Sequence, residues 1–188
     1  MKIIVLFVLF LGSQFLFSQD EISEDNKIAS VNNVYGIQLG VLGVWCHYEK
    51  KITKTITLRS ELGLDFGFRK GVLTNNNVVF AFIPNIVLEP RWYYNFKNRV
   101  EKGRSVRANS GGFLGLKLQY LPDFFVISNK KNLSVSESIS FIPKIGYRKV
   151  WDSNLVFESA FGIGKQYGFE SNLNDISVDL TFRIGYNF

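Results

Sequence analysis

The stretch ISVDLTFRIGYNF, residues 176–188, decides the class of fold. Apolar or aromatic residues alternate in it with small, polar or charged residues at every position. Strict period two indicates a β-strand with one apolar face and one polar face. The stretch is longer than an average strand of a globular protein. Its length suits a strand that crosses a membrane, which needs about 9–11 residues.

One such strand also occurs in soluble β-sandwiches, so the assignment depends on the rest of the chain. The same alternation appears in six further segments, at 35–48, 55–69, 80–96, 110–121, 138–151 and 155–167. In segment 55–69 the apolar face includes Leu62, and the opposite face, which includes Gly63, carries four charges. Those charges would disrupt the core of a sandwich but can pair in a polar lumen. We therefore expect Leu62→Arg to be far more costly than Gly63→Ser.

The polar faces of the predicted strands carry charges of both signs, and we predict that these charges form a coupled network in a lumen. The predicted network consists of Arg59, Glu61, Asp65, Arg69, Glu89, Arg91, Lys117, Lys144, Arg148, Glu158, Asp179 and Arg183. In hydrocarbon, strands are stable only in a closed barrel, because an open edge leaves backbone groups without partners.

Aromatic residues provide an independent argument, because membrane barrels carry an aromatic girdle at each interface. If strand directions alternate, one rim carries Trp45, Tyr48, Trp92, Tyr94, Tyr147, Trp151, Tyr186 and Phe188. All three tryptophans fall at this rim, together with short links at Glu49 and Asp152, so we predict that it is periplasmic. The polar loops at 71–77, 122–137 and 170–175 would then be extracellular.

The seven segments are one strand short of an even number, and bacterial single-chain barrels have even strand numbers. We therefore expect one more strand. Either a short strand precedes Tyr35, for which 27–33 is a poor candidate, or one segment contains two strands. We predict an all-β fold, an antiparallel up-and-down transmembrane β-barrel of eight strands.

The N-terminus has the layout of a secretory signal peptide. Lys2 is followed by an apolar run at 3–11 that is too short to span a membrane as a helix. We predict a signal peptide at 1–18, a flexible mature segment or short first strand at 19–33, and an outer-membrane barrel at 34–188. The single Cys excludes an internal disulfide and a cysteine-cluster metal site. The net charge of +6 is spread along the chain, which argues against nucleic-acid binding.

Few residues suggest chemistry, and we predict no catalytic residue, metal site or cofactor. His47 is the only histidine, and it is expected at the periplasmic rim without a surrounding motif. Cys46 is expected to be a small buried residue near that rim. The basic connection 97–109 is either a solvated turn or a contact for anionic lipid headgroups.

Several of these features together resemble the small outer-membrane β-barrel families of Gram-negative bacteria, of OmpA-type or porin-like barrels. They are the signal peptide, the paired segment Gly36–Asp65, the strand LEPRWYYN at 88–95 and the closing RIGYNF at 183–188. The resemblance implies contact with outer-membrane lipid and recognition of the last strand by the barrel-assembly machinery. It implies no single activity, because the fold hosts structural proteins, adhesins, small pores and lipid-modifying enzymes.

The first functional hypothesis is a non-enzymatic outer-membrane barrel with a plugged, charged lumen and a structural or surface-interaction role. An interior of eight strands is just wide enough to be filled by its own side chains, which favours a plug over a pore. A narrow channel for small solutes, a lipid-modifying enzyme and a soluble periplasmic barrel that binds a hydrophobic ligand are the alternatives.

Overall fold

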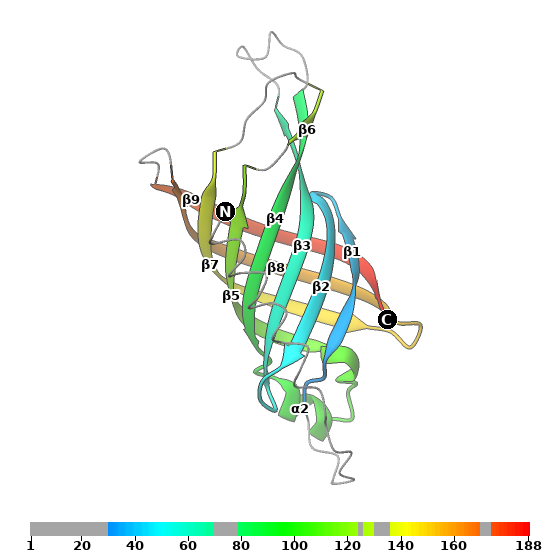
Figure 1. Ribbon diagram of the computed structural model, residues 1–188. Helices are drawn as coiled ribbons and strands as arrows, with labels where there is room; N and C mark the ends of the chain where they lie inside the picture. The colour runs from blue at the N-terminus through cyan, green and yellow to red at the C-terminus, as the bar shows by residue number, and fades with distance from the viewer. Residues whose placement is uncertain (1–29, 70–78, 124–125, 130–135, 170–173) are drawn as a thin grey trace, which may run out of the picture.

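The computed structural model describes residues 30–69, 79–123, 126–129, 136–169 and 174–188, and it forms a closed antiparallel β-barrel of eight strands (Figure 1). The strands are β1 (Val34–Gly40), β2 (Gly43–Lys51), β3 (Ile56–Arg69), β4 (Val79–Trp92), β5 (Gly111–Leu121), β7 (Ser138–Val150), β8 (Leu155–Gly168) and β9 (Asn174–Asn187). Each strand pairs with the next, and β9 pairs with β1 to close the barrel. A ninth short strand, β6 (Ile127–Ser128), lies outside the barrel and pairs with one end of β4. The predicted all-β, eight-stranded, up-and-down barrel is therefore confirmed, whereas the predicted signal peptide lies outside the described residues.

The eighth strand comes from a hairpin within the segment 35–48, which was predicted as one strand. β1 ends at Gly40, β2 begins at Gly43, and these two residues face each other across a two-residue turn. Gly43 has φ of 148°, a conformation that L-residues with a side chain rarely adopt. Residues 30–33 form no strand, so of the two predicted alternatives the structure has the second, in which one segment contains two strands.

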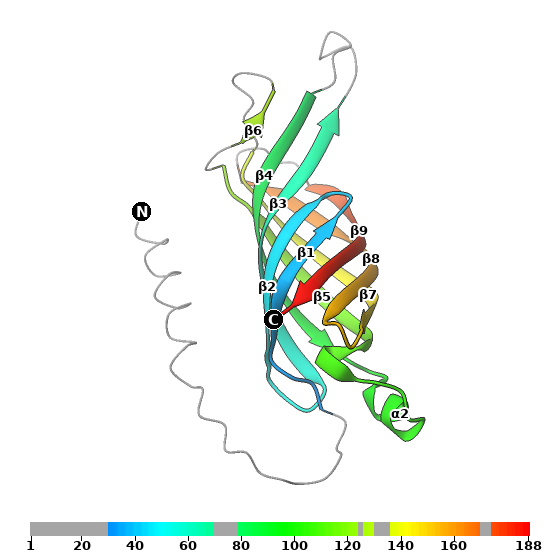
Figure 2. The ribbon, with the colours of Figure 1, turned by 90° about the vertical axis from the view of Figure 1, so that its right-hand side faces the viewer.

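The connections divide the barrel into two ends (Figure 2). The turn end carries the links 52–55, 93–110 and 151–154, together with the start of β1 and the end of β9. The loop end carries the ends of β3, β5 and β8 and the starts of β4, β7 and β9. The basic link at the turn end contains two short helices, α2 (Phe96–Glu101) and η3 (Arg107–Asn109), where a plain connection was predicted. Among the described residues, no helix is long and apolar enough to cross a membrane.

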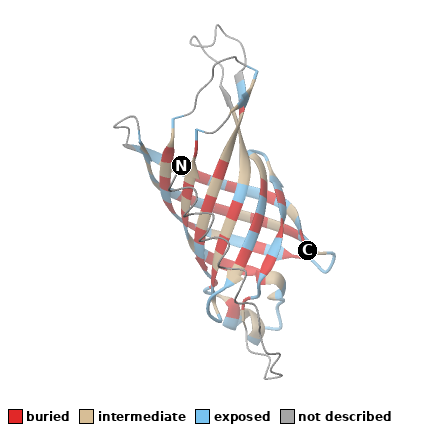
Figure 3. Ribbon diagram, viewed as in Figure 1, coloured by how far each residue is buried: buried red, intermediate tan, exposed pale blue. Residues whose placement is uncertain are grey.

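Buried residues alternate with more exposed ones along the barrel strands (Figure 3). The outer surface is apolar: on β9, for example, Val178, Leu180 and Phe182 are all more than half exposed. The interior holds charge instead, since Arg59 and Glu89 are fully buried. This distribution is the reverse of a soluble globular protein, in which charged residues are seldom fully buried.

Candidate functional site

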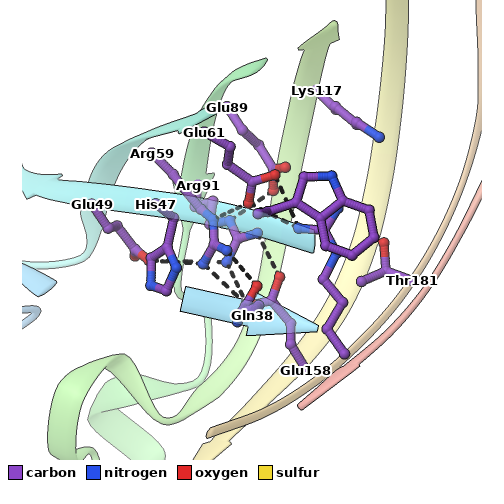
Figure 4. Close-up of polar contacts among 12 residues, drawn as sticks. Gln38, His47, Glu49, Arg59, Glu61, Glu89, Arg91, Lys117, Glu158 and Thr181 are labelled. Atoms are coloured by element: carbon purple, nitrogen blue, oxygen red, sulfur yellow. Dashed lines mark hydrogen bonds and ion pairs between the residues drawn. The ribbon is translucent and has the colours of Figure 1, made fainter. Parts of the chain in front are cut away.

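Glu158 on β8 is the centre of a cluster of charged side chains inside the barrel (Figure 4). Its carboxylate accepts hydrogen bonds from Arg91 (2.7 Å and 3.2 Å), Arg59 (3.2 Å) and Arg148 (3.3 Å). Gln38 on β1 contacts the same carboxylate at 3.4 Å and accepts a 2.6 Å bond from Arg59. Side chains of five different strands thus meet at one carboxylate, so the cluster joins distant parts of the wall.

Glu49 on β2 is a second anionic centre, nearer the turn end. It accepts hydrogen bonds from the Tyr93 hydroxyl (2.7 Å), the Thr57 hydroxyl (2.8 Å) and the Asn109 amide (3.0 Å). Arg148 reaches its other oxygen at 3.3 Å. Because Asn109 belongs to η3, the Glu49 carboxylate ties the link 93–110 to the barrel interior.

Three further acidic residues extend the cluster toward the loop end. Glu61 binds Arg183 at 2.9 Å and also contacts Arg59. Glu89 binds Lys144 at 2.9 Å and Arg91 at 2.7 Å. Asp179 lies 3.4 Å from Lys144 and 3.5 Å from Lys117. Buried ion pairs need several partners of this kind, because desolvation of each ion would otherwise exceed the attraction within the pair.

An apolar group lies beside the cluster, mostly toward the turn end. It consists of Val31, Tyr93, Phe96, Phe113 and Ala160, all of them buried. The segment that carries Val31 is held in place by hydrogen bonds, since its backbone N–H donates to the carbonyl of Lys54 (2.9 Å). The guanidinium of Arg91 lies 4.1 Å from the Phe113 ring centre, so the apolar group directly contacts the charge cluster.

On the loop-end side of the cluster the barrel contains a half-open cavity of about 450 Å³. We call it the upper chamber; its inward-facing lining residues are Trp45, Asp65, Lys117, Gln119, Asp179, Thr181 and Arg183. The indole of Trp45 lies between the chamber and the cluster. Its Nε1–H donates to Asp65 at 3.0 Å, and the Arg183 guanidinium lies 3.8 Å from the centre of its ring.

The structure places most of the predicted lumen residues in this interior. Ten are buried: Arg59, Glu61, Glu89, Arg91, Lys117, Lys144, Arg148, Glu158, Asp179 and Arg183. Asp65 is half-buried and faces the upper chamber, whereas the side chain of Arg69 lies outside the described residues. Sequence reasoning missed Glu49, because it was assigned to a turn, and Asn109, because the connection 97–109 was predicted as a solvated turn or a lipid contact. Tyr93 lay on the polar face of the predicted strand 80–96 but was not singled out as a partner of the charges.

The predicted girdle at the turn end requires one correction. Tyr48, Trp92, Tyr94, Tyr147, Trp151, Tyr186 and Phe188 are exposed on the outer surface. Trp45 is only 4% exposed and points inward, because the two-residue turn at 41–42 exchanges the two faces between β1 and β2. The same exchange corrects two neighbours: Cys46 is exposed on the outer face, and His47 is buried beside Arg148 rather than at a rim.

Gly63 on β3 faces Trp45, and this contact contradicts the expectation that an inward substitution there is mild. A Cβ at position 63 would collide with Cδ1 of the indole and lie 2.9 Å from the Asn85 amide oxygen. Gly67, on the same face of the same strand, has no atom within 4 Å of such a Cβ. The two glycines therefore form a matched pair in which only the local packing differs.

Gly63→Ala should lower the free energy of unfolding by about 1–3 kcal/mol, the usual range for overpacking. Gly67→Ala should leave it unchanged within about 0.5 kcal/mol. Urea titrations of both variants, followed by tryptophan fluorescence, compare the two values. Equal losses at the two positions would show that the indole does not pack on Gly63.

Within residues 30–69, 79–123, 126–129, 136–169 and 174–188, no three His, Cys, Asp or Glu side chains are arranged to hold a metal ion. No family model matches the chain, and no curated protein or solved structure matches it. The barrel, its charge cluster and the upper chamber are the features of the molecule that bear on function.

Proposed function

We propose that this chain is an integral outer-membrane β-barrel protein with a closed, charged lumen and a non-enzymatic structural or surface-interaction role. The observation that carries the proposal is the reversed distribution of polarity. An apolar surface surrounds the strands, and the fully buried side chains include Arg59, Arg91 and Arg148. Only hydrocarbon makes such an outer surface favourable, since a soluble protein would expose a very large apolar patch to water.

Aromatic and basic residues at the turn end support this location. Trp92 and Tyr94 pack edge to face, and Tyr35 stacks on Phe188, with ring centres 5.9 Å apart. Lys149 lies 5.4 Å from the centre of the Trp151 ring. Aromatic rings with adjacent cations suit the interface where hydrocarbon meets lipid headgroups. We assign this end to the periplasm because it carries the short links 52–55 and 151–154, and we assign the loop end to the cell exterior.

Closure of the lumen is supported by the residues that fill it. The ion pairs around Glu158 and Glu49 connect strands across the interior, and the apolar group at the turn end lies below them. An interior of eight strands leaves little room beyond its own side chains. A passage for solutes would require these buried ion pairs to separate, which is energetically costly.

Two measurements test the proposal. The protein should remain in the outer-membrane fraction after carbonate washing, and its mobility on gels should change on heating. In planar bilayers it should show no discrete conductance steps, because the charge cluster closes the lumen. Release by carbonate would contradict the membrane location, and a stable conductance would identify a channel and contradict the closed lumen.

The last strand resembles strands that the barrel-assembly machinery recognises, and Phe188 directly follows it. Deleting Phe188 should reduce insertion in cells more than it reduces refolding in detergent. The folded barrel loses one partly exposed ring. The loss of unfolding free energy should therefore be smaller than that for a fully buried aromatic side chain, which is about 1.5–3 kcal/mol. Heat-modifiable gel mobility compares membranes with refolded protein. Normal insertion of the shortened chain would show that Phe188 is not the recognition element.

A further inference from the structure

The wall of the barrel has an opening beside the upper chamber. β1 pairs with β9 only between Gly36↔Asn187 and Gly40↔Arg183, so residues 174–182 of β9 extend beyond their last partner in β1. On the other side, residues 66–69 of β3 extend beyond the last residue paired with β2. In the described part of the chain, no strand pairs with β9 on this side there. We call the opening the lateral notch; it is bounded by 174–182, 66–69 and the turn 41–42.

The lateral notch lies within the apolar surface of the barrel and not above it. Its lower boundary is the turn Val41–Leu42, whose side chains are 83% and 47% exposed. A turn that met water would favour Gly, Pro, Asn, Asp or Ser, as the turn at 152–154 does. The outward residues of β9 beside the notch, Val178, Leu180 and Phe182, are also apolar. If the chain spans a membrane as proposed, the notch opens into hydrocarbon.

The edge of β9 in the notch presents backbone hydrogen-bonding groups as well as apolar side chains. The N–H of Phe188 donates to the Tyr35 carbonyl of β1, whereas the N–H of Asn187 points toward β8 and donates to Asn154. Because these directions alternate along a strand, Val178 and Leu180 direct their N–H and C=O groups into the notch. Hydrocarbon alone cannot satisfy such groups. A suitable occupant therefore has polar atoms as well as an apolar chain.

The chamber behind the notch carries balanced charge. Of its lining residues, Lys117 and Arg183 are cationic, and Asp65 and Asp179 are anionic. The pair between Lys117 and Asp179 is long, at 3.5 Å. The same cavity is lined at its mouth by apolar residues from the turn, β3 and β9: Val41, Leu42, Phe66, Val178, Leu180 and Phe182. Charges of both signs inside and hydrocarbon outside match an amphiphile with a zwitterionic head.

The width of the notch favours lipid chains over a polypeptide strand. At the base of the notch, β1 and β2 lie between β9 and β3. The distance from β9 to β3 along the wall is therefore three strand spacings, or about 14 Å. A single added strand would occupy one strand spacing beside β9 and leave the rest of the gap empty. A lipid can fill a gap of this width, with its polar atoms beside β9 and its hydrocarbon chains in the remainder.

We propose that the upper chamber is a lipid-binding site. It holds the zwitterionic head group of a membrane phospholipid, whose hydrocarbon chains leave sideways through the lateral notch. This inference rests on the proposed membrane location and adds a ligand to a protein otherwise assigned a structural or surface role.

A photo-reactive benzophenone side chain, placed at two positions of β5, tests the site. Gln119 faces the chamber, and Leu116 on the same strand faces outward. Each full-length variant is refolded into vesicles of equal phosphatidylethanolamine, which is zwitterionic, and phosphatidylglycerol, which is anionic. After irradiation, mass spectrometry identifies the attached lipid, and heat-modifiable mobility verifies that both variants are folded.

The Leu116 variant should capture the two lipids equally. The Gln119 variant should capture phosphatidylethanolamine in about five-fold excess or more over phosphatidylglycerol. An affinity difference of this size is expected from one charge-assisted contact. Adding Asp65→Asn to the Gln119 variant should move its ratio of captured lipids toward the ratio of the Leu116 variant. The reason is that the chamber then loses an anion that can face the ammonium group of phosphatidylethanolamine.

Each other result contradicts a different statement. Capture at Leu116 without capture at Gln119 would overturn the lipid site and leave the membrane location intact. Equal capture of both lipids at Gln119 would overturn the zwitterionic head group, as would an unchanged ratio in Asp65→Asn. A protein-sized adduct at Gln119 in irradiated host membranes would identify a polypeptide as the occupant. No capture at either position would overturn the proposed function itself.

Discussion

A Glu158→Gln variant should lose about 3–5 kcal/mol of unfolding free energy relative to the native sequence, the range for breaking a buried ion pair from one side. Its carboxylate contacts Arg59, Arg91 and Arg148, and all four side chains are fully buried. Glutamine keeps the shape but leaves three guanidinium groups without their shared anion. Urea unfolding in lipid vesicles measures the loss.

A control variant and a double variant test whether the loss comes from the charge cluster. Asp152→Asn changes an acidic residue that is fully exposed at the turn end, and it should leave stability nearly unchanged. Combining Glu158→Gln with Arg91→Gln should cost less than the sum of the two single changes, because one removes the charge that the other leaves unpaired. Additive losses would contradict a coupled cluster.

A Leu62→Arg variant should lose about 2–4 kcal/mol, the cost of a cation on the lipid face near the middle of a membrane barrel. Leu62 is 63% exposed and lies in the middle of β3, opposite Cys46 and Ile86. In a soluble protein, the same change at so exposed a position would be nearly neutral. Folding titrations in vesicles therefore measure the surroundings of the outer face.

Ile56→Arg is the matched control for Leu62→Arg. Ile56 lies on the same outer face of β3, but at the turn end, where it pairs with Trp92 of the aromatic girdle. Near the interface the cost should fall to about 0–1 kcal/mol. If the two arginines were equally costly, the apolar surface would not be a membrane-spanning band.

The sequence predicted the faces of most strands because period two is a direct consequence of strand geometry. From β3 to β9 the inward positions carry the charges that the alternation assigns to a lumen, for example Arg59, Lys144 and Glu158. Closure into a barrel followed from the need to pair every edge in hydrocarbon. Neither inference required knowledge of which strands are neighbours.

The β1–β2 hairpin lacks the usual sequence signal of a turn. Its turn is Gly40-Val41-Leu42-Gly43, with apolar residues at the two central positions where Asn-Gly or Asp-Gly would be the usual signal. The alternation shifts by one position at the adjacent apolar residues Val41 and Leu42, but without a polar turn residue the segment looks like one long strand. The exchange of faces at this turn explains why Trp45 and Cys46 were assigned to the wrong sides.

The remaining members of the cluster depend on contacts distant in sequence. Glu49 meets Asn109 and Arg148 only because η3 lies against β7 and the barrel is closed. A carboxylate followed by two lysines has the local pattern of a solvated turn. Nothing within a short window distinguishes it from a buried anion, because its partners are 60 and 99 residues away.

The short contact between β1 and β9 has a consequence for the order of folding. These strands match over five residue pairs, whereas β3 and β4 match over fourteen. The β1–β9 contact also joins the most distant parts of the barrel sequence, so closing it has the largest entropic cost for only five pairs. We expect neighbouring hairpins to form first and this seam to close last. On heating, the same seam should open before the rest of the wall separates.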